Sequence, residues 1–100
     1  MQRLTGKIAW VTGAGSGIGE AGALALAREG ASVMLTGRRK EPLDAAAARI
    51  AKDGGTARVH PGDMSRSEDA LAITGAIEKE FGRLDILVNK PSDAMPTLIA

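Results

Sequence analysis

Three residue types are absent or scarce in this 100-residue sequence, and each shortage excludes a class of chemistry. There is no cysteine, so disulfides, thiolate metal sites and cysteine nucleophiles are excluded. The single histidine, His60, excludes a histidine-rich metal site and any relay that needs two imidazoles. There is also no tyrosine, and the two aromatic residues, Trp10 and Phe81, are expected in the core. These shortages predict no metal site built from cysteine or histidine.

Long apolar runs and an excess of one charge are missing as well. No run approaches the roughly 20 residues that a membrane-spanning helix needs, and we expect residues 1–3 to lead into a strand, not a signal peptide. Thirteen basic and 12 acidic residues give a net charge of +1 without a basic block, so neither nucleic acid nor an anionic membrane is an expected partner. The composition is typical of one globular domain, which we expect in the cytoplasm.

Four short apolar runs alternate with segments of helical periodicity. We expect buried strands at residues 7–12, 31–36, 56–60 and 84–89. Helices are predicted between them, and Glu41-Pro42 is expected to start the second one, because a proline at the first helical position loses no needed hydrogen bond. Strands separated by helices cannot pair as hairpins. The sequence therefore predicts an α/β fold with a doubly wound parallel sheet in the order β-α-β-α-β-α-β.

The third helix and the last segment of the sequence are less regular. Ser65 and Glu68 have the spacing of a capping box, which predicts the start of that helix. Its expected inner face consists of Leu71, Thr74, Ile77 and Phe81. Residues 90–100 hold two prolines and no clear period, and we interpret them as an irregular tail after a domain at residues 1–89. The fourth strand would then be an exposed sheet edge, which favours self-association or aggregation.

Glycines cluster where the first strand meets the first helix, in the segment Thr-Gly-Ala-Gly-Ser-Gly-Ile-Gly at residues 12–19. Gly13 permits the tight turn, Gly17 lets backbone N–H groups approach a pyrophosphate, and Gly19 lets the helix pack closely. The helix start would then receive the phosphates. The alternative is a turn that merely joins a strand to a helix, but its place in the alternation favours nucleotide binding. A P-loop is excluded, because no lysine followed by Ser or Thr closes the segment.

Three motifs together resemble the short-chain dehydrogenase/reductase family over residues 1–89. Residues 12–19 match its Thr-Gly-x-x-x-Gly-Ile-Gly motif, and residues 63–65, Asp-Met-Ser, match the Asp-apolar-Ser/Thr after its third strand. Residues 84–89, Leu-Asp-Ile-Leu-Val-Asn, are similar to the lead-in to its Asn-Asn-Ala-Gly motif. The resemblance implies a Rossmann-type fold and the binding of a nicotinamide dinucleotide.

The resemblance also implies roles for individual residues. The pyrophosphate and the adjacent ribose would be held by Gly13, Gly15, Ser16, Gly17, Ile18 and Gly19. The Asp63 carboxylate would accept a hydrogen bond from the adenine amino group, beside the backbone of Met64, and Asn89 would lie near the adenosine ribose. A turn-forming aspartate after Pro-Gly is the alternative for Asp63.

The end of the second strand bears on which dinucleotide binds. NAD-binding versions of this fold place a carboxylate there for the ribose hydroxyls, whereas this sequence has Gly37 at that position. Nothing then repels a 2′-phosphate, and Arg38 and Arg39 can bind it. The sequence predicts NADP(H) in preference to NAD(H). A solvated basic loop is the alternative.

The resemblance does not extend to the catalytic residues. The family uses a serine and a Tyr-x-x-x-Lys pair on a later helix, and this sequence has no tyrosine. Residues 89–92, Asn-Lys-Pro-Ser, also depart from Asn-Asn-Ala-Gly. Our hypothesis is the cofactor-binding part of an oxidoreductase for an alcohol or carbonyl substrate, truncated or frame-shifted and catalytically incomplete. The alternatives are a complete non-catalytic dinucleotide-binding module or partner subunit, and an inert translation product.

Overall fold

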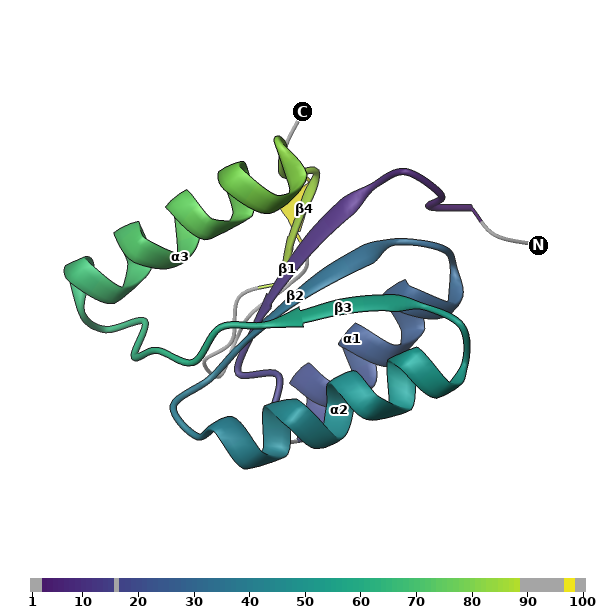
Figure 1. Cartoon of the computed structure of the whole chain (residues 1–100), viewed down its shortest axis with the longest axis horizontal. Coiled ribbons are helices and arrows are strands. Elements are labelled where there is room, and N and C mark those ends of the chain that lie inside the picture. Colours follow the sequence, from purple (N-terminus) through teal and green to yellow (C-terminus); the bar gives the residue numbers. More distant parts are fainter. Residues whose placement is uncertain (1–2, 16, 89–96, 99–100) are drawn as a thin grey trace.

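The computed structural model describes residues 3–15, 17–88 and 97–98 (Figure 1). Strands and helices alternate along the chain as the sequence predicts. The elements are β1 (Ile8–Thr12), α1 (Gly17–Arg28), β2 (Ser32–Thr36), α2 (Lys40–Lys52), β3 (Thr56–Val59), α3 (Ser67–Phe81), β4 (Ile86–Val88) and β5 (Thr97–Leu98). The observed ends of the first four strands lie within two residues of the predicted ones, because glycines and charged residues flank each apolar run.

The sheet has the strand order β3-β2-β1-β4-β5. The pairs β2–β3, β1–β2 and β1–β4 are parallel, and β1 lies in the middle with Trp10 opposite Met34 on one side and Leu87 on the other. This arrangement confirms the predicted α/β fold with a parallel, Rossmann-type sheet. Right-handed crossovers through the helices account for the reversal of strand order at β1.

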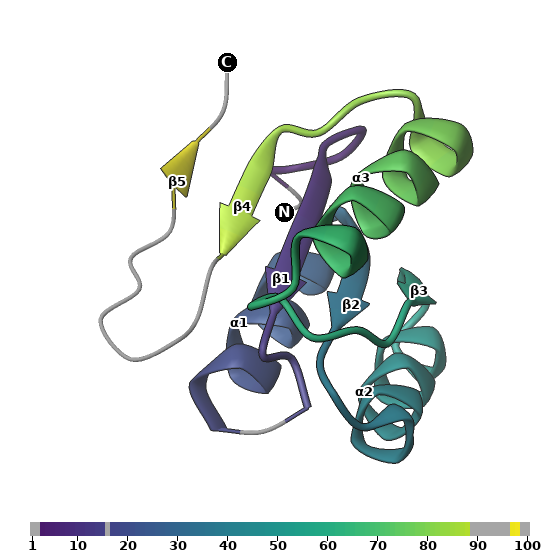
Figure 2. The ribbon, with the colours of Figure 1, turned by 90° about the vertical axis from the view of Figure 1, so that its left-hand side faces the viewer.

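Strand β5 is a difference from the prediction. The segment from residue 90 onward was expected to be irregular, yet Thr97–Leu98 pairs antiparallel with β4 (Figure 2). Strand β4 is therefore not the edge of the sheet. The self-association predicted through a β4 edge loses part of its structural basis, because β5 pairs with Ile86 and Leu87 on that edge.

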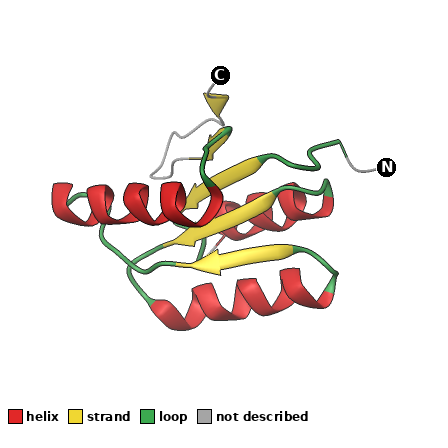
Figure 3. Cartoon of the chain, turned by 45° about the horizontal axis from the view of Figure 1, so that its top comes forward, coloured by secondary structure: helices red, strands yellow, loops and turns green. Residues whose placement is uncertain are grey.

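Helices cover both faces of the sheet (Figures 1 and 3). Helices α1 and α2 lie on one face, where the buried core consists of Ala9, Val11, Ala14, Ala23, Ala27, Ala31, Val33, Leu35, Leu43, Ala46, Ile50 and Ile86. Helix α3 lies on the other face, where the buried core consists of Ile8, Trp10, Met34, Ile73 and Ile77. The two sets alternate along β1 and β2, as the period of two in a strand requires.

The inner face of α3 differs from the predicted one. Ile77 is buried as expected, but its partner is Ile73, one turn earlier, and Leu71 is 73% exposed. Thr74 is exposed and Phe81 is half-buried. Residues two positions apart are separated by about 200° around a helix axis, so Leu71 points away from the sheet when Ile73 points toward it.

The predicted capping box at the start of α3 is also absent. The helix begins at Ser67, and its N-cap residue, Arg66, makes no capping hydrogen bond through its side chain. The Ser65 hydroxyl donates to Asp63 Oδ1 at 2.7 Å instead. The serine therefore orders the loop before the helix and does not cap the helix itself.

Two polar contacts fix the strands at their ends. At the start of β4, Asp85 accepts the Ile8 N–H at Oδ2 (2.8 Å) and donates its own N–H to the Ile8 carbonyl (2.9 Å). A hydrogen bond from the Arg83 guanidinium, and then the one from the Ile8 N–H, hold the pKa of Asp85 below its usual range. At the other end, the buried Trp10 Nε1–H donates to Thr36 Oγ1 at 3.0 Å.

No helix among the described residues is both long and apolar enough to cross a membrane.

Candidate dinucleotide-binding site

The carboxyl ends of β1, β2 and β3 meet three loops at one edge of the sheet. The Ala14 N–H donates to the Thr36 carbonyl at 3.0 Å, and the Gly62 N–H donates to the Gly37 carbonyl at 2.9 Å. A cavity of about 200 Å³ lies at this edge. It is lined by Gly13, Gly15, Gly37, Arg38, Arg39 and Pro42. In open parallel sheets, ligands bind at this edge, where the strand order reverses.

The glycines of the loop after β1 meet two different demands. Gly13 and Gly17 have φ angles of +65° and +53°, which side chains disfavour. Gly19 is needed for space, because a methyl group there would overlap the Gly13 carbonyl oxygen and lie 2.7 Å from its carbon. The loop and the first turn of α1 are thus in backbone contact. The start of α1, where a helix has N–H groups without partners in the helix itself, follows this loop directly.

Gly15 and Gly37 connect this loop to the second helix. A methyl group at Gly15 would lie 3.0 Å from Pro42 Cβ, and one at Gly37 would lie 3.3 Å from Leu43 Cδ2. The start of α2 is therefore packed against the glycine loop and the end of β2. This packing brings the positive end of a second helix dipole to the cavity.

The loop after β3 presents an ordered carboxylate. Asp63 Oδ1 accepts hydrogen bonds from the Ser65 hydroxyl (2.7 Å) and the Ser65 N–H (2.9 Å). These two bonds, with weaker help from the charge of Arg38, lower the pKa of Asp63. Asp63 is therefore an ionised acceptor at neutral pH, and both of these hydrogen bonds go to Oδ1.

Basic groups surround the same cavity. The Arg38 side chain is 80% exposed, and its Nε lies 3.9 Å from Asp63 Oδ1. Arg39 is exposed and is the N-cap residue of α2, where no side chain caps the helix. The helix begins at Lys40, so Pro42 is its third residue and not its first, and the uncapped backbone N–H groups of this turn belong to Lys40 and Glu41. The arrangement suits an anion that reaches the end of β2.

The structure brings most of the predicted residues together. Gly13, Gly15, Arg38 and Arg39 line one cavity, and the Arg38–Asp63 ion pair places the third loop beside it. Met64 follows Asp63 and packs against the core on the α3 side. The predicted Ser16 and Asn89 lie outside the described residues, and Ile18 is described only as part of α1.

Sequence reasoning missed one residue of this region. Asp69, in the first turn of α3, accepts the Asp63 N–H at Oδ2 (2.8 Å). The sequence shows an acidic residue in a first helical turn, which is common for electrostatic reasons alone. Its contact with the loop depends on how the chain turns at residues 63–66 and has no signature in the sequence.

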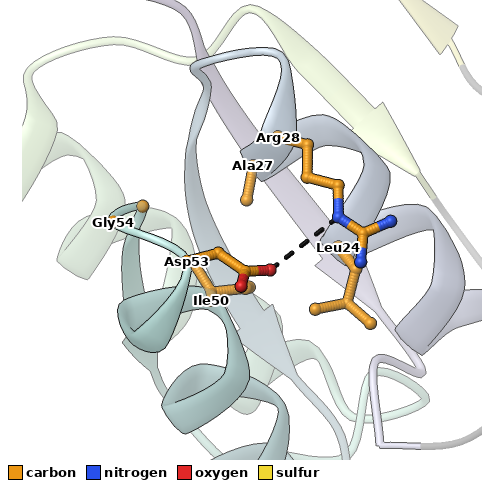
Figure 4. Close-up of a pocket in the computed structure, with 7 residues that line it drawn as sticks. Leu24, Ala27, Arg28, Ile50, Asp53 and Gly54 are labelled. Carbon is orange, nitrogen blue, oxygen red and sulfur yellow. Dashed lines mark ion pairs between the residues drawn. The ribbon is translucent and has the colours of Figure 1, made fainter.

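A second cavity, of about 110 Å³, lies between the carboxyl ends of α1 and α2 (Figure 4). Arg28 Nε lies 3.8 Å from Asp53 Oδ2 across its mouth, with Ile50 and Leu24 below. Its first lining residue on α1, Leu24, lies about two turns, or roughly 10 Å along the helix, from Gly17 at the glycine loop. This cavity is not part of the candidate site. No cluster of three or more potential metal ligands occurs among the described residues.

Comparison with known proteins agrees with this geometry. The family model for short chain dehydrogenases matches residues 7–92. An uncharacterised oxidoreductase of Staphylococcus aureus strain MRSA252 is 42% identical over 99% of this chain and 42% of its own length.

Two solved structures are similar in both sequence and fold. A metagenomic short-chain oxidoreductase in complex with NADP is 42% identical, with a TM-score of 0.85, over 89% of this chain and 40% of that one. NAD+-bound xylitol dehydrogenase is 34% identical, with a TM-score of 0.87, over 91% of this chain and 35% of that one. The chain thus spans about two fifths of the length of these relatives. Since the family model matches most of its residues, the chain belongs to the short-chain dehydrogenase family.

Proposed function

We propose that this chain is the dinucleotide-binding part of an oxidoreductase for an alcohol or carbonyl substrate, and that it binds NADP(H) in preference to NAD(H). The observation that carries the preference is the end of β2. Gly37 occupies the position of the ribose-binding acid, and Arg38, Arg39 and the uncapped start of α2 border the same cavity. The relatives include both an NADP complex and an NAD+ complex, so the preference rests on these residues.

Electrostatics favours the phosphorylated ribose. A 2′-phosphate adds up to two negative charges beside the Arg38 guanidinium, whose Nε lies 3.9 Å from Asp63 Oδ1. A guanidinium can bind a phosphate through two parallel hydrogen bonds, and the start of a helix adds backbone donors. NADH lacks the group that would use these contacts.

The remaining contacts follow the same geometry. Gly13, Gly15, Gly17 and Gly19 support binding of the pyrophosphate, because at these positions no side chain can screen the backbone N–H groups. The ionised Asp63 suits the adenine amino group, with the Met64 backbone beside it. Contacts of Ser16, Ile18 and Asn89 with the cofactor remain predictions from the sequence.

Binding is the contribution that we assign to these residues. A bound nicotinamide supplies the hydride chemistry of such a reaction. The sequence contains no tyrosine, so the Tyr-x-x-x-Lys pair of the family is not among these 100 residues.

Calorimetric titration with NADPH and NADH tests the proposal. We expect NADPH to bind at least about tenfold more tightly, and Arg38→Ala to weaken NADPH about tenfold while NADH changes less than about threefold. Arg28→Ala is the matched control, because it removes an exposed guanidinium at the other cavity. Equal dissociation constants for NADPH and NADH would overturn the preference, and no binding of either would overturn the function.

A further inference from the structure

The loop that carries Asp63 is held by a contact from outside the cavity. Asp69 Oδ2 accepts the Asp63 N–H at 2.8 Å, and this bond is partly buried. Asp69 occupies the third position of α3, from which an acidic side chain can reach back over the start of its helix. Here it reaches past the N-cap, Arg66, to a residue six positions earlier in the sequence.

The other hydrogen bonds of this loop involve groups other than the Asp63 N–H. The Gly62 N–H donates to the Gly37 carbonyl at 2.9 Å, and the Arg66 N–H donates to the Asp63 carbonyl at 2.9 Å. Ser65 holds the carboxylate of Asp63, not its backbone nitrogen. The Asp69 carboxylate therefore fixes the peptide group from which the Asp63 side chain projects.

Close packing of the loop against α3 explains why this helix supplies the acceptor for the Asp63 N–H, a contact that we call the clamp. A methyl group at Gly62 would lie 3.4 Å from Asp69 Cβ and 2.9 Å from Ile73 Cδ1. The loop thus runs directly over the first two turns of the helix. A buried core on the α3 side, which includes Ile73, anchors these turns to the sheet.

We propose that Asp69 is a positioning residue for the adenine end of the dinucleotide. It acts through Asp63 and does not itself touch the nucleotide. Loss of this acceptor leaves the Asp63 N–H to water and frees the peptide to rotate, so the carboxylate no longer stands where the adenine amino group needs it. The inference rests on the proposed function, because it assigns Asp63 to adenine.

The neighbouring Glu68 provides a matched control. It lies in the same first turn of α3 and contributes the same charge to the helix dipole, but its carboxylate is exposed and lies 3.8 Å from Arg66. Glu68→Ala and Asp69→Ala therefore remove equal charge from one helix start, whereas only Asp69→Ala removes the clamp. Asp69→Asn removes the charge and keeps an oxygen acceptor.

The test uses the 100-residue chain with two readouts: the dissociation constant of 2′,5′-ADP, and the hydrogen-exchange rate of the Asp63 amide by NMR. For Asp69→Ala we expect affinity to fall about five- to tenfold and exchange to quicken by at least as much. Asp69→Asn should stay within about threefold of wild type in both readouts, and Glu68→Ala should leave both unchanged.

The outcomes separate this inference from the proposed function. If the wild type binds 2′,5′-ADP and Asp69→Ala binds it equally well, the positioning role is wrong and the function stands. Equal losses in Asp69→Ala and Glu68→Ala would assign the effect to the helix dipole and also overturn the role. A wild type that binds no 2′,5′-ADP overturns the proposed function, and the role of Asp69 with it.

Discussion

The two faces of the sheet are packed with different kinds of residue. Six of the twelve buried residues on the α1–α2 face are alanines, whereas the α3 face is filled by Ile8, Trp10, Met34, Ile73 and Ile77. Small residues let helix backbones approach the strands closely. On that side the cavity is lined by the glycine loop, by the end of β2 with Arg38 and Arg39, and by Pro42 of α2. On the α3 side, the loop after β3 contributes side chains to this edge of the sheet, such as Asp63 with its hydrogen bonds to Ser65.

The contrast teaches that one edge of the sheet combines two kinds of recognition. Backbone donors suit phosphates, which every nicotinamide dinucleotide carries. Side chains such as Asp63 and Arg38 suit the groups that distinguish one nucleotide from another. Substitutions on the two faces should therefore have different consequences.

The largest effect is expected at Gly19. In Gly19→Ala the new methyl group overlaps the Gly13 carbonyl oxygen, so the loop or the helix must move. We expect the free energy of unfolding to fall by about 4 kcal/mol, a large part of what a domain of this size has. Urea denaturation followed by circular dichroism measures it.

The control for this substitution lies on the same helix. A methyl group at Gly22 would meet nothing within 4 Å, so Gly22→Ala should stabilise the chain by up to about 1 kcal/mol through helix propensity. Equal unfolding midpoints for the two variants would show that the close packing at Gly19 is not as described.

Buried leucine and isoleucine side chains compare the two faces directly. Leu43→Ala and Ile77→Ala should each cost about 3 kcal/mol, because both side chains are buried. Leu43 also supports Gly37 and Gly15, so its loss should weaken NADPH binding, whereas Ile77→Ala should leave the affinity of the folded fraction unchanged. Titrating NADPH into both variants, at a temperature where both are folded, measures this difference in affinity. A matching loss of affinity in Ile77→Ala would contradict the division between the faces.

The smallest effect is expected where the start of β1 meets the start of β4, through the hydrogen bonds between Ile8 and Asp85. Because the folded-state pKa of Asp85 is lowered, its stabilising contribution is complete above the pKa of the unfolded chain and is lost as the pH falls through the folded-state pKa. The melting temperature should therefore fall as the pH drops below about 4. Asp85→Asn should melt lower at pH 7 and depend less on pH over this window.

Two other acids complete the pH experiment. The pKa of Asp63 is lowered as well, so some acid sensitivity should persist in Asp85→Asn. Glu78→Gln, an exposed position on α3, is the control and should follow the wild-type curve. An Asp85→Asn curve parallel to wild type would remove Asp85 from the acid response.

The sequence predicted the family and the main architecture because both depend on residue type at fixed places. Apolar runs that end at glycines marked the strands, and Gly13, Gly17 and Gly19 were predicted from backbone geometry that only glycine provides easily. Gly37 and Arg38 were likewise placed at the end of a strand because the second apolar run ends there, about 20 residues after the glycines.

The rest depended on contacts between distant parts of the chain. Helix α3 carries more apolar residues than one face needs. Periodicity therefore predicted Leu71 on the buried face, whereas in the structure Ile73 is buried and Leu71 is exposed. Asp69 and Asp85 act on backbone groups six and 77 positions away, and acidic residues at element ends are common without such partners. A two-residue strand such as β5 is too short to produce a pattern.

The central place of β1 has a consequence for how the chain folds. Its contacts with β2 join residues such as Trp10 and Thr36, 26 positions apart, whereas its contact with Asp85 spans 77. On the ribosome, the β1–α1–β2 unit is complete long before β4 has been synthesised. Such distant pairing raises the contact order and slows folding. Strand β1 is thus paired with β2 well before it can pair with β4, and until β4 has been made its second edge stays unpaired, which exposes the chain to aggregation.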